Sequence, residues 1–245
     1  MKNFNWEAFF NNWETEFGFD IFCRDGIVDP TLYSSDSVPY KVLFVLKDVH
    51  IPDETKKAIR EEKRIVDMRK EVFLEGEGKT WNPIALWAKA LTEITPIPFE
   101  DVSSGITLRK ETLPKVAFMN IKKDAGNASV SNECVLAYAR EQSSNLIEEI
   151  RACSPDLVIA CSKGDVFNIL RDELFKVNCC EELPKIELNE KMHKFGHFFD
   201  ISGFIGKNDP VYLVEYRHPS QCGRQGTNKE HYENMLKIRQ FAFGD

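Results

Sequence analysis

Four short apolar runs, rich in β-branched and aromatic residues, constrain most strongly how this 245-residue chain folds. None alternates cleanly between apolar and polar residues, which is typical of strands buried on both faces. Stretches with helical periodicity separate them, and this alternation indicates right-handed crossovers and a parallel sheet. The predicted strands span residues 41–47, 115–121, 156–161 and 211–216.

We therefore expect one α/β domain over residues 1–245, with three α/β/α layers around a central, mostly parallel four-stranded sheet. An edge hairpin is predicted between residues 184 and 206, and a charged insertion at residues 53–78. Ser154 and Pro155 indicate a stop and a turn before the third strand. The predicted helices span residues 82–95, 132–153, 165–175 and 228–241, with an amphipathic helix at the N-terminus.

Composition limits the function. The formal net charge of −7 argues against broad electrostatic adhesion to nucleic acid, although local basic faces remain compatible with it. No stretch approaches the roughly 18 apolar residues of a membrane span. Seven scattered cysteines indicate reduced thiols, and hence a soluble cytoplasmic protein. Cys179 and Cys180 lack a partner pair at zinc-site spacing, so no metal is expected.

Polar residues follow all four predicted strands, where an open parallel sheet forms its ligand crevice. Alone, Asp48 could be a helix cap, Asn120 could satisfy local backbone groups, and His218 could be structural. Together, an acid, an amide and an imidazole converge from three strands, which indicates a site. Trp81 is the candidate stacking ring, although a core position fits it too.

The sequence resembles the uracil-DNA glycosylase superfamily from about residue 41 to residue 236. The resemblance rests on the strand ending in Asp48, on MNIKKDAG at residues 119–126, on SPDLVIACSKG at residues 154–164, and on His218-Pro219-Ser220. It is closest to the branch that often carries an iron-sulfur cluster. Of that branch's cysteines only Cys23 and Cys134 have rough counterparts, so we expect neither a cluster nor another cofactor.

The resemblance implies roles for individual residues. Asp48 would orient or activate the hydrolytic water, and His218 would stabilise negative charge on the departing base. Asn120 would read the edge of a flipped base, with His50 and Trp81 as further base contacts. The predicted phosphate contacts are Ser220, Arg217, Arg224 and Lys122, partly because residues 217–229 contain three basic residues and no acidic one.

We expect an N-glycosidic bond hydrolase that excises a uracil-like or deaminated base from DNA, single strands included. The first motif, LKDVH at residues 46–50, lacks the Gly, Pro and Tyr of the family's GQDPYH. The alternative is therefore a noncatalytic protein that binds a nucleotide or nucleic acid with the same fold. Both readings require Asp48, Asn120 and His218 to open onto one pocket wide enough for a planar base.

Two other classes fit the sequence less well. A dinucleotide enzyme is disfavoured because no Gly-x-Gly-x-x-Gly follows a predicted strand. A metalloenzyme that uses His193 and His197 is disfavoured because their spacing suits a helix, whereas the surrounding residues read as a strand.

Overall fold

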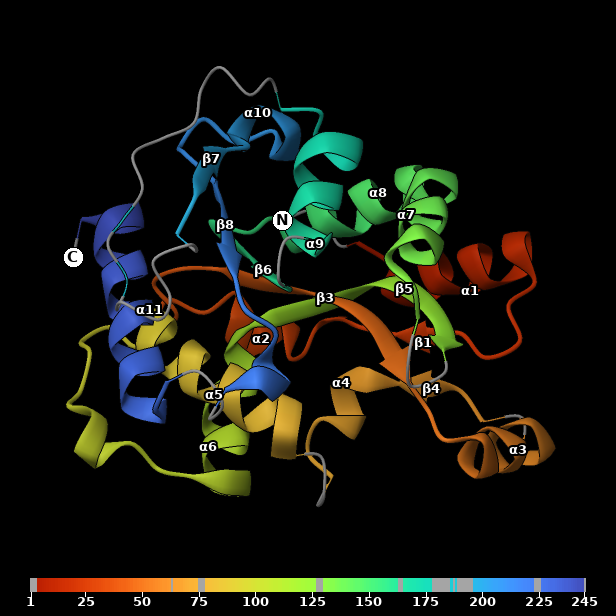
Figure 1. The fold of residues 1–245 in the computed structure, drawn as a ribbon, viewed down its shortest axis with the longest axis horizontal. Coiled ribbons are helices and arrows are strands. Elements are labelled where there is room, and N and C mark those ends of the chain that lie inside the picture. The colour runs from red at the N-terminus through yellow and green to blue at the C-terminus, as the bar shows by residue number, and fades with distance from the viewer. Residues whose placement is uncertain are drawn as a thin grey trace.

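The computed structural model describes residues 4–62, 64–74, 78–126, 130–162, 165–177, 186, 188, 196–222 and 226–244. Its centre is a mixed, mostly parallel sheet of six strands in the order β2-β5-β3-β6-β8-β7 (Figure 1). These strands are β2 (Gly26–Ile27), β5 (Ala117–Gly126), β3 (Val42–His50), β6 (Leu157–Cys161), β8 (Tyr212–Tyr216) and β7 (Phe198–Asp200).

The four predicted strands are the parallel centre of this sheet, β5-β3-β6-β8. The prediction missed β2, which pairs antiparallel with β5, while β7 pairs antiparallel with β8. Two residues of β2 are too few to form a detectable pattern. Strand β7 comes from the predicted edge hairpin and pairs with β8; most of the other predicted half, residues 185–189, lies outside the described residues.

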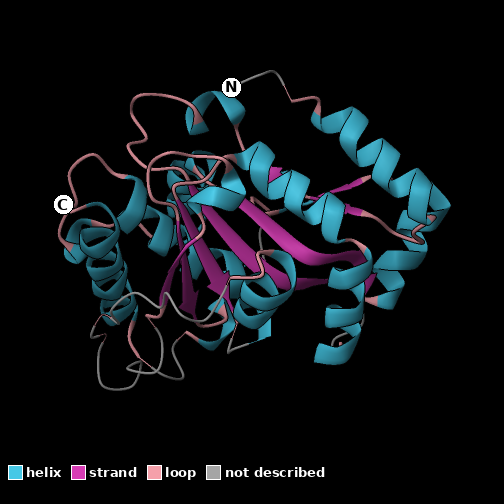
Figure 2. Cartoon of the chain, turned by 90° about the horizontal axis from the view of Figure 1, so that it is seen from above, coloured by secondary structure: helices cyan, strands magenta, loops and turns pink. Residues whose placement is uncertain are grey.

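Helices cover both faces of the sheet (Figures 1 and 2). Alternate residues of β3 point to opposite faces: Phe44 packs with the helices of one layer and Val45 with those of the other. One layer contains α5 (Gly78–Thr92), α6 (Gly105–Thr112) and α11 (Asn228–Phe243). The other contains α1 (Trp6–Phe17), α7 (Asn132–Glu141), α8 (Ser143–Cys153) and α9 (Asp165–Asn168).

The helix predicted over residues 132–153 is two helices, which corrects the expectation of one. The backbone leaves helical geometry at Gln142, with φ −97° and ψ 11°. The side chain of Gln142 is buried and accepts a hydrogen bond from Nε1 of Trp13 at 2.7 Å. This contact with α1 is long-range, so periodicity could not reveal it. Helix α8 ends where predicted: Ser154 adopts a left-handed conformation, with φ 46°, before Pro155.

The charged insertion is helical and anchored. It contains α3 (Asp53–Glu62), β4 (Val66–Asp67) and α4 (Met68–Glu71), and β4 pairs in parallel with β1 (Cys23–Arg24). Ile59 and Val66 belong to a small apolar cluster with Ile21 and Val49, which attaches the insertion beside the end of β3. Short helices α2 (Pro30–Tyr33) and α10 (Ser202–Ile205) complete the labelled elements. Among the described helices, none has the length and apolar content needed to cross a membrane.

Candidate functional site

The end of β3, an inner residue of β5 and the segment that follows β8 meet at one cavity of about 410 Å³, within the usual range for small-ligand pockets. Six of the predicted site residues line it: Asp48, His50, Trp81, Asn120, His218 and Ser220. Leu46, Val49, Met68, Lys79 and Thr80 complete the lining. The structure therefore brings the predicted acid, amide and imidazole to a common cavity.

Asp48 lies near the end of β3, where the pairing with β5 shifts register between Asp48 and His50. Burial raises the pKa of the Asp48 carboxyl, while the neighbouring Lys47, Lys122 and His50 oppose the rise. Lys47 turns to the opposite side of the strand, where its Nζ donates to the carbonyl of Val130 at 2.8 Å. Lys47 thus influences the carboxylate through its charge and does not line the cavity.

Gly126, at the end of β5, leaves room for the Asp48 carboxylate. A Cβ atom at this position would lie 3.1 Å from Oδ2 of Asp48 and 2.8 Å from Cγ2 of Val130. Any larger residue would push the carboxylate or the backbone aside, since such contacts are below van der Waals distance. Sequence reasoning did not single out this role, because it depends on the register shift between two strands.

Asn120 lies on β5 with only 3% of its surface exposed, and it lines the cavity. Its side-chain Nδ2 donates to Oδ2 of Asp25 at 3.0 Å, and its backbone N–H donates to the same oxygen at 2.7 Å. Asp25 lies between β1 and β2 and is fully buried. The amide that would face a ligand is therefore held from behind by a carboxylate.

His218 precedes a 3₁₀ turn, Pro219–Gln221, and its ring closes that turn. The backbone N–H of Ser220 donates to Nδ1 at 3.2 Å, and the hydroxyl of Ser220 lies 2.8 Å from the same nitrogen. Burial lowers the pKa of His218, and the charge of Lys47 lowers it further. A neutral ring with an unprotonated Nδ1 carries its proton on Nε2, so the ring offers a single N–H donor.

Trp81, near the start of α5, is both a core residue and a wall of the cavity. It is 4% exposed, and its ring centroid lies 4.6 Å from that of Phe118 on β5. The two readings of Trp81 are thus compatible: one part of the indole packs in the core, and the residue borders the space where a planar group would lie.

The structure does not place Arg217 or Lys122 in the lining of the cavity. Arg217, which directly follows β8, is fully buried. Nζ of Lys122 donates to the carbonyl of Asp124 at 2.6 Å and to its carboxylate at 3.0 Å, beside the ring of Tyr138. Arg224 lies outside the described residues. Ser220 remains as the predicted phosphate contact that is exposed at the cavity.

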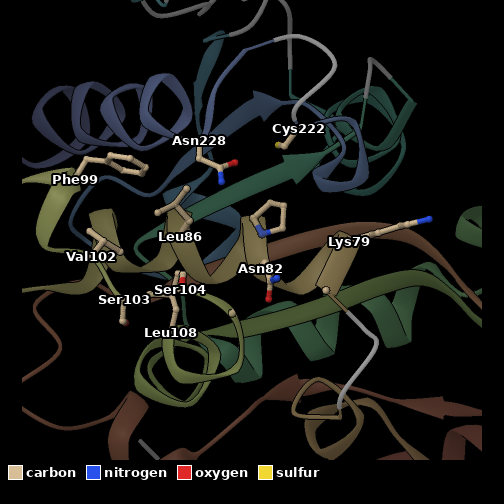
Figure 3. A pocket seen from close by; sticks show the side chains of 13 residues that line it. Lys79, Asn82, Leu86, Phe99, Val102, Ser103, Ser104, Leu108, Cys222 and Asn228 are labelled. Atoms are coloured by element: carbon tan, nitrogen blue, oxygen red, sulfur yellow. The ribbon is translucent and has the colours of Figure 1, made fainter.

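Lys79 is a cation at the cavity that sequence reasoning missed. It is exposed and lines both this cavity and a second cavity of about 340 Å³ (Figure 3). Leu86 of α5 and Leu108 of α6 line the second cavity, whereas the side chain of Lys79 extends away from them (Figure 3). The available signal was its position directly after the Gly-rich stretch at residues 76–78, at the start of a helix.

Within the part of the chain that the structure describes, no group of three or more His, Cys, Asp or Glu side chains is arranged to hold a metal ion. No model of a known protein family matches the chain, and no curated protein matches it.

Proposed function

We propose that this chain is an N-glycosidic bond hydrolase with a uracil-DNA glycosylase-like α/β/α fold, and that it excises a uracil-like or deaminated base from DNA. One observation carries the proposal: Asp48 near the end of β3, Asn120 within β5 and His218 after β8 line a single cavity together with Trp81. The polar groups that such a reaction needs are thus available around one bound base.

The chemistry separates charge. The bond between C1′ of the sugar and the base nitrogen breaks, and its electron pair leaves with the base. Asp48 faces the positive sugar and accepts the proton of the water whose oxygen bonds to C1′. The Nε2–H of His218 donates to the base oxygen on which negative charge develops. The departing base then takes up a proton from solvent.

Asn120 and Trp81 recognise the base. A base in a duplex must leave its stack to enter such a cavity, and the cost is lowest for a mismatched or single-stranded base. An amide on the wall reads hydrogen-bonding groups on the edge of the base, and an indole provides apolar contact area. The net charge of −7, and Lys79 as the one exposed lysine among the described residues that line the cavity, favour a short single-stranded substrate over a long duplex footprint.

The test is the release of free base from single-stranded and mismatched oligonucleotides that contain uracil, hypoxanthine, xanthine or thymine. We expect release by the wild-type protein, and loss of release in Asp48→Asn and in His218→Ala. Asp209→Asn is the matched control, because Asp209 is exposed and lies outside the cavity. Release from none of the substrates would contradict hydrolysis and favour the noncatalytic binding function.

A further inference from the structure

Asp25 is a buried polar residue behind the cavity for which the sequence predicted no role. Asp25 is fully buried, and its carboxylate has three donors around it: the backbone N–H of Asn120, Nδ2 of Asn120, and Nζ of Lys123. The two contacts with Asn120 measure 2.7 and 3.0 Å. With three donors around it, the Asp25 carboxylate acts as a hydrogen-bond acceptor.

This arrangement determines which way the Asn120 amide faces. An ionised carboxylate only accepts hydrogen bonds, so the amide group that faces Asp25 must be the NH₂. The flipped amide would put its oxygen at hydrogen-bond distance from a carboxylate oxygen, in a buried place where uncompensated polar contacts are costly. Asp25 therefore selects one of the two amide orientations.

The orientation leaves a defined group for a ligand. Oδ1 of Asn120 accepts no hydrogen bond from any described residue, whereas Nδ2 is already engaged by Asp25. Because Asn120 lines the cavity, the acceptor that it can offer there is Oδ1. A ligand needs a donor to satisfy it, such as the ring N–H of uracil or hypoxanthine. Cytosine and adenine carry an unprotonated ring nitrogen at the corresponding position, which is an acceptor.

A buried cation holds Asp25 in place. Nζ of Lys123 forms ion pairs with Asp25 and with Glu149, the latter at 2.7 Å, and all three side chains are fully buried. Burial lowers the pKa of Lys123, but the two carboxylates outweigh it and raise the pKa overall. Burial raises the pKa of Glu149 well above its usual range. Lys123 thus lies between the two carboxylates and holds Asp25 against Asn120.

We infer that Asp25 is a positioning residue that sets base selectivity by fixing the Asn120 amide with Oδ1 toward the cavity. The inference rests on the proposed function for the identity of the ligand, a base with a ring N–H donor. Asp25 acts through Asn120 and does not line the cavity itself.

The test compares the binding of free uracil and free cytosine by isothermal titration, which requires no catalysis. In the wild-type protein we expect uracil to bind about 10–100-fold more tightly, the effect of one unsatisfied buried polar group. Asp25→Asn should narrow this ratio at least about tenfold, because an amide at position 25 can face Asn120 with either its NH₂ or its oxygen. The matched control is Asp29→Asn, since Asp29 caps α2 and asparagine caps equally well.

Equal weakening of both bases in Asp25→Asn, with an unchanged ratio, would indicate a merely structural role and overturn the inference. Binding of neither base to the wild-type protein would also overturn it. Selective uracil binding without base release from oligonucleotides would refute the hydrolase function alone and leave the role of Asp25 supported.

A second measurement covers the case in which Asp25→Asn does not fold. In the wild-type protein with ¹⁵N-labelled asparagine, one Nδ2 hydrogen of Asn120 should exchange slowly with solvent, since it is bound to a buried carboxylate. Exchange of both hydrogens at the rate of an exposed asparagine would overturn the inference.

Discussion

Nδ1 of His218 accepts a hydrogen bond from the backbone N–H of Ser220, with 3.2 Å between the two nitrogen atoms. A backbone N–H only donates, so the bond leaves the proton of the neutral ring on Nε2. The orientation and the tautomer of the imidazole are therefore set by the peptide that follows it. The Ser220 hydroxyl lies 2.8 Å from the same nitrogen, but the backbone N–H alone is enough to fix the tautomer.

This relationship separates two variants. His218→Ala should lower the single-turnover rate of base release by about 10²–10³-fold, the usual effect of removing a donor to a developing anion. Ser220→Ala keeps the backbone N–H and should lose less than about tenfold, the effect of one ordinary hydrogen bond. Equal losses in the two variants would contradict a tautomer set by the backbone.

Asp48→Asn should raise the melting temperature at pH 7 while it abolishes base release. Burial raises the pKa of Asp48, so the folded protein holds this proton more tightly than the unfolded chain does. The stabilising contribution is full below the ordinary pKa of 3.8 and is lost as the pH rises through the folded value. Asparagine cannot ionise and avoids that loss.

Thermal unfolding of the wild type and Asp48→Asn at pH 7 and near pH 4 checks this expectation. The difference in melting temperature between Asp48→Asn and the wild type should be smaller near pH 4. The control Asp209→Asn should melt at the same temperature as the wild type at both pH values. A lower melting temperature of Asp48→Asn at pH 7 would show that the carboxylate contributes contacts that outweigh its burial.

Gly126→Ala should lower base release by less than about 100-fold, the cost of displacing a catalytic group by about 1 Å, because Asp48 needs to move by only a few tenths of an ångström. The added Cβ would lie 3.1 Å from Oδ2 of Asp48. Overpacking should also reduce the free energy of unfolding by about 1–3 kcal/mol. Gly203→Ala is the control, since a Cβ there meets nothing within 4 Å. Unchanged kinetics in Gly126→Ala would show that Asp48 tolerates displacement.

His231 should make the fold sensitive to mild acid. It is fully buried, its Nδ1 lies 3.0 Å from the Tyr216 hydroxyl, and burial lowers its pKa to about 4. Its stabilising contribution is full above the unfolded value of about 6.5 and is lost as the pH falls toward 4. Between pH 7 and pH 5 the protonation of His231 should lower the free energy of unfolding by about 2 kcal/mol.

Urea unfolding at the two pH values measures the effect. His231→Gln lacks the titrating group, so its free energy of unfolding should fall by about 2 kcal/mol less than that of the wild type over the same interval. Parallel pH dependence of the two proteins would refute the assignment to His231.

Lys79→Ala should weaken the binding of single-stranded oligonucleotides of any sequence and reduce the dependence of log K on log salt concentration by about 0.7, the single-strand value for one phosphate contact. Lys57→Ala is the control, because Lys57 is exposed on α3 and already paired with Glu61. Fluorescence anisotropy at several salt concentrations gives both slopes. The same slope for Lys79→Ala and the wild type would exclude a phosphate contact.

The parts of the fold that could be predicted depend on local pattern. The four central strands are long enough to form apolar runs, and their order along the chain determined which polar residues meet at the carboxyl ends. Asp48, Asn120 and His218 could therefore be assigned to one cavity without knowledge of any contact. Helix α11 likewise begins at the predicted residue, after a capping box formed by Thr227 and Glu230.

The parts that could not be predicted depend on contacts between distant residues. Asp25 lies 95 residues before Asn120 in the chain, and nothing around it indicates that strand β5 runs beside it. Arg217 is buried and Lys122 pairs with Asp124, and neither feature follows from the sequence, because charge alone does not reveal which side of the backbone a residue takes. The break at Gln142 coincides with a hydrogen bond to Trp13, which lies 129 residues earlier in the chain.

The two outermost strands have a further consequence. Strand β2 has two residues and β7 has three, and both run antiparallel to the long strands that they cover. An edge this short exposes few unpaired backbone groups, so it is a poor template for the addition of a strand from another molecule. Strand β7 pairs with β8 at Tyr212, Leu213 and Val214, whereas β2 pairs with β5 only at Ala117 and Phe118, so the two margins of the parallel centre are shielded to different extents.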